Sequence, residues 1–140
     1  MEHIFVLKST DSTHFYPDNT ITRFRIKLYN PLTLKGCWKV ALTELHLFNV
    51  KGGVPNALLV QSPLCENLTV VGGDKHLPVL RYIARQKPKD VSWTFENPMY
   101  LSVNQTFVES LEINITDGEG NPLSFQSGTL VCVLHLVRGG

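Results

Sequence analysis

The stretch Thr20–Tyr29, TITRFRIKLY, alternates between two kinds of side chain at every residue. One set would face one side of an extended chain: Thr22, Phe24, Ile26 and Leu28. The other set would face the opposite side: Arg23, Arg25, Lys27 and Tyr29. A period of two is the pattern of a half-buried β-strand. The stretch therefore predicts an antiparallel strand with an apolar inner side and a basic outer side.

Extended stretches continue on both sides of this one, and no amphipathic helix interrupts them. They are His3–Lys8, Trp38–Asn49, Ala57–Gln61, Leu68–Val71, Leu77–Ala84, Ser92–Phe95, Tyr100–Val103, Glu109–Thr116 and Thr129–Val137. Many short strands with turn residues between them are typical of a β-sandwich or barrel. We expect an all-β, jelly-roll-like sandwich of about eight antiparallel strands, forming a single domain over residues 1–140.

Three local patterns give sharper expectations. The alternation in Trp38–Asn49 changes phase after Leu42, which predicts a β-bulge. Asn30-Pro31 is expected to end the strand that begins at Thr20. The stretch Thr129–Val137, TLVCVLHLV, is almost entirely apolar and predicts a strand buried on both faces, or nearly so.

Composition excludes several classes of protein. The chain has 140 residues, of which 43% are hydrophobic and 18% charged, and its net charge is +1. That hydrophobic share is too high for a disordered chain, and no apolar run approaches the roughly 18 residues of a membrane span. The first residues do not form a secretory signal. We expect no membrane contact, and nucleic acid is an unfavoured partner because such proteins are usually more basic.

The three cysteines are too far apart for a zinc-binding pair. They are Cys37, Cys65 and Cys132. We expect three reduced, mostly buried thiols in a reducing compartment. One disulfide and one free thiol is the alternative.

No motif for catalysis or metal binding stands out. The sequence contains no G-x-S-x-G, H-E-x-x-H, Walker or G-x-G-x-x-G pattern. His46 and His135 lie in predicted strands, where hydrogen-bonded framework roles are expected. Asp117–Pro122, DGEGNP, is expected to form a tight turn, because it lacks the length of a calcium loop. We therefore expect no enzymatic activity, no metal and no cofactor.

Two segments are candidates for interactions. Aromatic and arginine side chains anchor protein interfaces, which makes a basic–aromatic surface a candidate. Its residues are Phe15, Tyr16, Arg23, Arg25, Lys27 and Tyr29. A solvated basic face is the simpler alternative. The end of the chain, Val137-Arg138-Gly139-Gly140, matches the apolar-x-Gly-Gly sites that adenain-type proteases cleave, and a flexible linker is the alternative.

Three blocks of residues, taken together, resemble one family. The first is Phe5-x-Leu7-x-Ser9-x-x-Ser12, followed by Phe15-Tyr16-Pro17-x-Asn19-x-x-x-x-Phe24. The second is Pro31-Leu32-x-Leu34-x-Gly36-x-Trp38-x-Val40-Ala41-Leu42-x-Glu44-Leu45. The third runs from Tyr100-Leu101-x-Val103 through Phe107, Leu111-Glu112-Ile113, Asp117, Gly120 and Pro122-Leu123 to Gly128, Cys132 and Leu134-His135. The chain resembles the virion-type proteins of Polinton/Maverick elements and adintovirus-like viruses.

The resemblance implies a non-enzymatic structural protein of a virus or virus-like element. Such a protein would assemble with itself, as a trimer or pentamer, or dock on other capsid proteins. It would be made in the host cytoplasm or nucleus and reside in the virion, and an adenain-like protease would give the Gly139-Gly140 end a purpose. The alternative is a monomeric module for glycans or host proteins, which exposed Tyr16, Trp93 or Tyr100 would favour.

Overall fold

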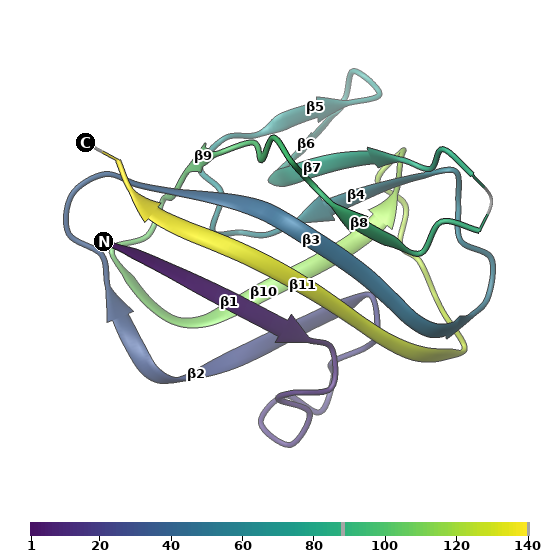
Figure 1. Cartoon of the computed structure of the whole chain (residues 1–140), viewed down its shortest axis with the longest axis horizontal. Coiled ribbons are helices and arrows are strands. Elements are labelled where there is room, and N and C mark those ends of the chain that lie inside the picture. Colours follow the sequence, from purple (N-terminus) through teal and green to yellow (C-terminus); the bar gives the residue numbers. More distant parts are fainter. Residues whose placement is uncertain (88, 140) are drawn as a thin grey trace.

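The computed structural model describes residues 1–87 and 89–139, and it contains two β-sheets packed face to face (Figure 1). The first sheet has the strand order β1 (Glu2–Lys8), β11 (Ser127–Arg138), β3 (Trp38–Lys51) and β8 (Ser92–Thr94), and β9 (Leu101–Ser102) also pairs with β3. The second sheet has the order β2 (Arg23–Thr33), β10 (Phe107–Asp117), β4 (Ala57–Gln61) and β7 (Val79–Ala84). A small hairpin joins β5 (Thr69–Val71) to β6 (Lys75–Leu77).

The order in which the chain visits the two sheets identifies the topology. The chain places β1 in the five-stranded sheet, β2 in the four-stranded sheet and β3 back in the first, and it returns to the four-stranded sheet for β4 and β7. It then places β8 and β9 in the first sheet, β10 in the second and β11 in the first, with every pairing antiparallel. With β8 and β9 counted as one interrupted strand, this is the eight-strand jelly roll. The all-β sandwich predicted from the sequence is confirmed.

The inward faces of the sheets form one hydrophobic core. Phe24, Ile113 and Leu134 are among its fully buried side chains. Trp38 begins β3 as a buried anchor, and its indole Nε1 donates to the Lys35 carbonyl at 3.0 Å. A buried indole N–H without an acceptor would be destabilising, so this bond lets the ring enter the core.

The bulge expected in β3 is present. The ladder between β3 and β11 shifts where Val133 pairs with Glu44 and Leu134 pairs with Leu42, which leaves Thr43 as the extra residue of a bulge. Gly128 has φ +121°, and a Cβ there would lie 2.6 Å from Val50 Cα. Only glycine permits this backbone approach at the start of β11.

Two expectations about strands are wrong in detail. β2 continues through Pro31 to Thr33, although its ladder with β10 shifts register between Lys27 and Leu32. An edge strand tolerates proline there because it can lose an N–H on its free side. The predicted strand Leu77–Ala84 is split between β6 and β7 at Pro78. The prediction that β11 is buried on both faces, or nearly so, is confirmed: on its outer side Val131 is buried, and Val133 and Val137 are half-buried.

Candidate functional site and interaction surfaces

The outer side of the five-stranded sheet is the first candidate surface, and we call it the apolar face. Ile4 and Val6 on β1 are 66% and 57% exposed, although both are aliphatic. Val6 lies directly opposite Val133 in the ladder with β11, and Phe48 is exposed at the far end of β3. The apolar face consists of three exposed side chains, Ile4, Val6 and Phe48, and of the β11 valines beside them: Val133 and Val137 are half-buried, and Val131 is buried.

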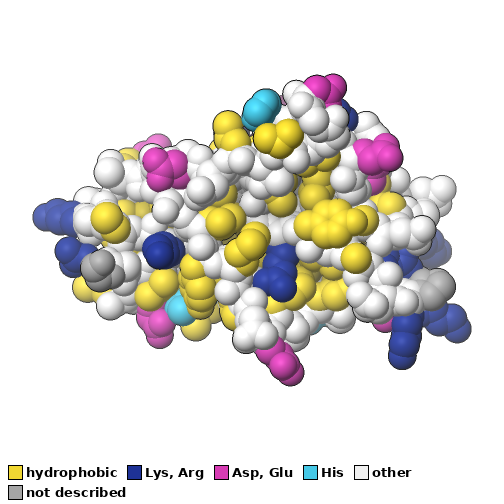
Figure 2. Space-filling view, turned by 90° about the horizontal axis from the view of Figure 1, so that it is seen from above, with side chains coloured by type: hydrophobic (Ala, Val, Ile, Leu, Met, Phe, Trp, Pro, Cys, Tyr) yellow, Lys and Arg dark blue, Asp and Glu magenta, His cyan; other side chains and the backbone are white. Residues whose placement is uncertain are grey.

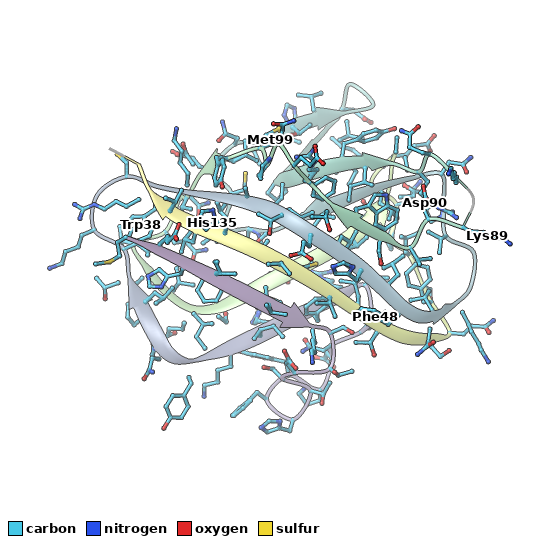
Figure 3. All side chains as sticks on the ribbon, in the orientation of Figure 1. Trp38, Phe48, Lys89, Asp90, Met99 and His135 are labelled. Atoms are coloured by element: carbon cyan, nitrogen blue, oxygen red, sulfur yellow. The ribbon has the colours of Figure 1, made fainter. Side chains whose placement is uncertain are left out.

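Five polar side chains on or beside this face bind one another. His135 Nε2 lies 2.6 Å from Glu2 Oε2, and its Nδ1 lies 2.7 Å from the Tyr100 hydroxyl. His46 Nε2 lies 2.9 Å from Glu44 Oε1. His135 and Phe48 mark opposite ends of the face (Figure 3). Because these five groups already have partners, covering them would cost less free energy than covering polar groups without partners.

The outer side of the four-stranded sheet is the second candidate surface, and we call it the groove face. Its main hollow has a volume of about 520 Å³ and is walled by the loop before β2, by β2 itself and by Glu112 of β10. Smaller hollows of about 330 and 270 Å³ adjoin it. The residues around the main hollow are Phe15, Tyr16, Pro17, Asp18, Asn19, Arg23, Phe24, Arg25 and Glu112.

The cations of the groove face have partners within the chain. The Arg25 guanidinium lies 5.4 Å from the Tyr16 ring centre, and Lys27 Nζ lies 4.6 Å from the Phe15 ring centre. Glu112 forms ion pairs with Arg23 at 3.7 Å and with Arg25 at 3.8 Å. The basic outer side of β2 is therefore largely compensated, and cation–π contacts hold the aromatic loop on the strand.

The loop before β2 also closes the free edge of that strand. The backbone amides of Arg23, Arg25 and Lys27 donate to the side chains of three loop residues, at 3.0, 3.0 and 3.1 Å: Thr20 Oγ1, Asn19 Oδ1 and Ser12 Oγ, respectively. Asn19 Nδ2 further donates to the Arg25 carbonyl at 2.9 Å. These polar loop residues thus satisfy edge groups that would otherwise be open to another strand.

The structure brings five of the six predicted surface residues together. Phe15, Tyr16, Arg23, Arg25 and Lys27 surround adjoining hollows of the groove face. The sixth, Tyr29, extends into solvent and is 97% exposed. No sequence pattern indicated Glu112 as a partner of the basic stripe, because the register of β10 on β2 decides that contact.

The predicted processing segment is part of the sheet. Val137 pairs with Lys39 and Arg138 with Trp38, and the Gly139 amide donates to the Cys37 carbonyl at 2.7 Å. Gly140 lies outside the described residues. Cleavage by an adenain-type protease stays a prediction.

The thiols are free cysteines: Cys65 and Cys132 are buried, and Cys37 is exposed. Burial raises the pKa of both the Cys132 and the Cys65 thiol, which makes these groups poor nucleophiles. In the described residues, no group of three or more His, Cys, Asp or Glu side chains is placed to hold a metal ion. Among those residues there is also no helix long and apolar enough to cross a membrane.

Figure 2 shows the molecule from the side of β5, β7 and β9, where hydrophobic side chains reach the surface among scattered Lys and Arg side chains. Arg81 lies on this edge with its guanidinium 4.0 Å from the Phe95 ring centre, and its Nη1 donates to the Asn97 carbonyl. Here too the cation is engaged within the chain.

No family model matches the sequence, and no curated protein matches it. Among solved structures, the chain is similar to the Drosophila NLP core, described for its pentamer formation and histone binding, at 11% identity over 100% of both chains with a TM-score of 0.44. It is also similar to VP2 of the infectious bursal disease virus subviral particle, at 13% identity over 99% of this chain and 33% of that chain, with a TM-score of 0.27. The jelly-roll assignment rests on the strand order of this chain rather than on these similarities.

Proposed function

We propose that this chain is a non-enzymatic structural protein that assembles with copies of itself and with other capsid proteins. The observation that carries the proposal is the apolar face, where Ile4 and Val6 are exposed beside Val133. Lasting protein interfaces are more apolar than ordinary surface, and a contiguous exposed apolar patch commonly marks one.

The pairing of polar groups within the apolar face supports the same proposal. Glu2, Tyr100 and His135 form a connected set that lies on a sheet surface rather than in a hollow. We assign this set a structural role, because it neutralises the polar groups that assembly would bury. The proposal includes no catalytic step and no cofactor.

The resemblance to virion-type proteins of Polinton/Maverick elements and adintovirus-like viruses narrows the proposal. It favours a place in a virion, synthesis in the host cytoplasm or nucleus, and closed rings such as trimers or pentamers. Other capsid proteins are then the further partners.

Native mass spectrometry of the full chain on dilution tests the proposal. We expect discrete oligomers that persist as the concentration falls. The matched variant is Ile4→Ser with Val6→Ser, which removes aliphatic surface at exposed positions and should leave the fold intact while reducing the oligomer fraction. A chain that stays monomeric at every concentration would contradict self-assembly.

A monomeric module for glycans or host proteins is the second candidate, and the hollow beside Tyr16 favours it. Tyr100, by contrast, is engaged with His135. A glycan-binding screen with the wild-type chain and Tyr16→Ala tests this candidate: binding that the variant loses would support it, and absence of binding to any glycan would leave only a protein ligand for that hollow.

A further inference from the structure

We propose that β1 is a pairing edge whose occupant is β1 of a second copy of this chain, aligned antiparallel about a two-fold axis at Phe5. The inference rests on the proposed function, since it says where two copies of the self-assembling chain would meet. It joins two five-stranded sheets into one continuous sheet and makes the apolar faces of both copies contiguous. Strand addition of this kind draws its affinity from main-chain hydrogen bonds.

The free side of β1 carries unpaired backbone groups. Met1 and Ser9 bond to β11, since the Arg138 amide donates to the Met1 carbonyl at 3.2 Å and the Ser9 amide donates to the Leu130 carbonyl at 2.9 Å. Antiparallel residues alternate between bonding inward and outward, so Ile4 and Val6 direct their amides and carbonyls away from β11. In the part of the chain that the structure describes, these two amides have no acceptor.

The open part of this edge ends at Lys8. The Lys8 amide donates to Asp11 Oδ2 at 3.1 Å, and the Lys8 carbonyl accepts from the Asp11 amide at 3.0 Å. The turn therefore closes the backbone at Lys8 and leaves only its exposed side chain available. Figure 1 shows β1 as the outermost strand of its sheet, with the loop beginning at this end.

The sequence of β1 is complementary to itself in one antiparallel register. With Phe5 on the axis, Ile4 lies opposite Val6 of the second copy, and Val6 opposite its Ile4. Both are residues with outward backbone groups, so each pair can exchange two hydrogen bonds. Glu2 lies opposite Lys8 of the second copy, and Lys8 opposite its Glu2, so opposite charges meet at both ends.

Neighbouring registers lack this match. Moving the axis to Ile4 sets Glu2 against Val6, and moving it to Val6 sets Ile4 against Lys8. Each places a charge against an aliphatic side chain at both ends. Glu2 also contacts His135 through Oε2, and its side chain remains 60% exposed, so the carboxylate stays accessible to a lysine of the second copy.

Apart from the charges at its two ends, Glu2 and Lys8, β1 lacks the devices by which proteins block their edge strands. It has no proline, no bulge and no charged side chain that points inward: its inward residues are His3, Phe5 and Leu7. An unprotected apolar edge is a template for pairing with another chain. Because Glu2 and Lys8 at the two ends of β1 are complementary to each other, pairing at this edge would be a specific two-fold contact.

A charge-swap series on the full chain tests the inference by sedimentation equilibrium. Lys8→Glu and Glu2→Lys each set like charges against each other at both ends, and we expect each to weaken the two-fold association about tenfold or more. The double variant Glu2→Lys with Lys8→Glu restores opposite charges and should restore association. Glu2→Lys also removes the contact with His135, whereas Lys8→Glu leaves that contact in place. If a thermal melt shows that Glu2→Lys is destabilised, Lys8→Glu is the variant to compare with wild type.

The outcomes separate this inference from the proposed function. The wild-type chain should form assemblies with an even number of copies, either dimers or pairs of rings, and the single variants should halve that number. Assemblies that both single variants leave unchanged would overturn the two-fold contact, while self-assembly itself would stand. A wild-type chain that remains monomeric would overturn both.

Discussion

Each of the two sheets ends in an edge strand on the same side of the sandwich, β1 in one sheet and β2 in the other (Figure 1). In the part of the chain that the structure describes, outward-facing amides of β2 are hydrogen-bonded within the chain, whereas those of Ile4 and Val6 on β1 are not. On β2, the amides of Arg23, Arg25 and Lys27 are occupied by loop side chains, and Pro31 follows in the same strand. On β1, the amides of Ile4 and Val6 point outward with exposed aliphatic side chains beside them. One edge is closed, and the other is open.

We expect this difference to decide where the fold accepts another chain. Charges and proline are the usual means of preventing edge-to-edge pairing, and β2 has both. The capping loop adds hydrogen bonds that another strand would have to displace. Association through β2 would thus replace existing bonds, whereas association through β1 would form new ones.

The largest expected effect comes from giving β1 a charge like those of β2. Val6→Lys places an ammonium group in the middle of the proposed contact, where it would be desolvated without a partner. We expect the association constant to fall by about a hundredfold or more, with an unchanged circular dichroism spectrum. Tyr29→Lys, at an exposed position of β2, is the control and should leave association unchanged; equal losses in the two variants would contradict the assignment to β1.

The converse change opens the closed edge. Asn19→Ala removes the side-chain bonds to both the amide and the carbonyl of Arg25, and we expect it to lower the free energy of unfolding by about 1–2 kcal/mol. The newly open edge should also produce additional association that Val6→Lys does not suppress. Urea denaturation and light scattering measure the two effects, and an Asn19→Ala chain as stable as wild type would show that the cap is not stabilising.

A smaller effect is expected on the groove face. Glu112→Gln removes the carboxylate shared by Arg23 and Arg25, and we expect a loss of less than about 1 kcal/mol in the free energy of unfolding. The difference from wild type should shrink as salt is added, because screening weakens the wild-type ion pairs. A difference that does not depend on salt would indicate that the ion pairs are not its source.

The smallest effect concerns the turn that links the two sheets between β10 and β11. The backbone amides of Asn121 and Glu119 each donate to Asp117 Oδ1 at 2.9 Å. Because these hydrogen bonds stabilise the ionised carboxylate, they hold the pKa of Asp117 below its ordinary value. A lowered folded pKa adds stability above the unfolded pKa, and that stability is lost as the pH falls through the folded pKa. Asp117→Asn should therefore be slightly less stable than wild type at neutral pH and equally stable in strong acid. Thermal melts across this pH range check the sign, and a gap that widens in acid would contradict it.

The period-two pattern predicted most of the strands, because burial on one face of a sheet imposes it directly. The bulge in β3 was also predictable, since a phase change in the alternation has few other physical causes. The continuation of β2 through Pro31 was not, because it depends on β2 being an edge strand, and strand order is not encoded locally.

The candidate surfaces were predicted only in part. The aromatic and basic residues of the groove face were visible as residue types, but their internal pairing with Glu112 depends on the register of β10. The apolar face could not be predicted, because alternation shows that Ile4 and Phe5 face opposite sides without showing which side is inward. The edge-capping roles of Ser12 and Asn19 likewise require the folded loop.

Residue-resolved amide hydrogen exchange at increasing protein concentration tests the central claim most directly. If copies pair through β1, the amides of Ile4 and Val6 should exchange more slowly as the chain associates, while those of Arg25 and Lys27 should keep the same rates. If the chain associates and the Ile4 and Val6 amides continue to exchange at the rates of the dilute chain, the open edge of β1 is not where the copies meet.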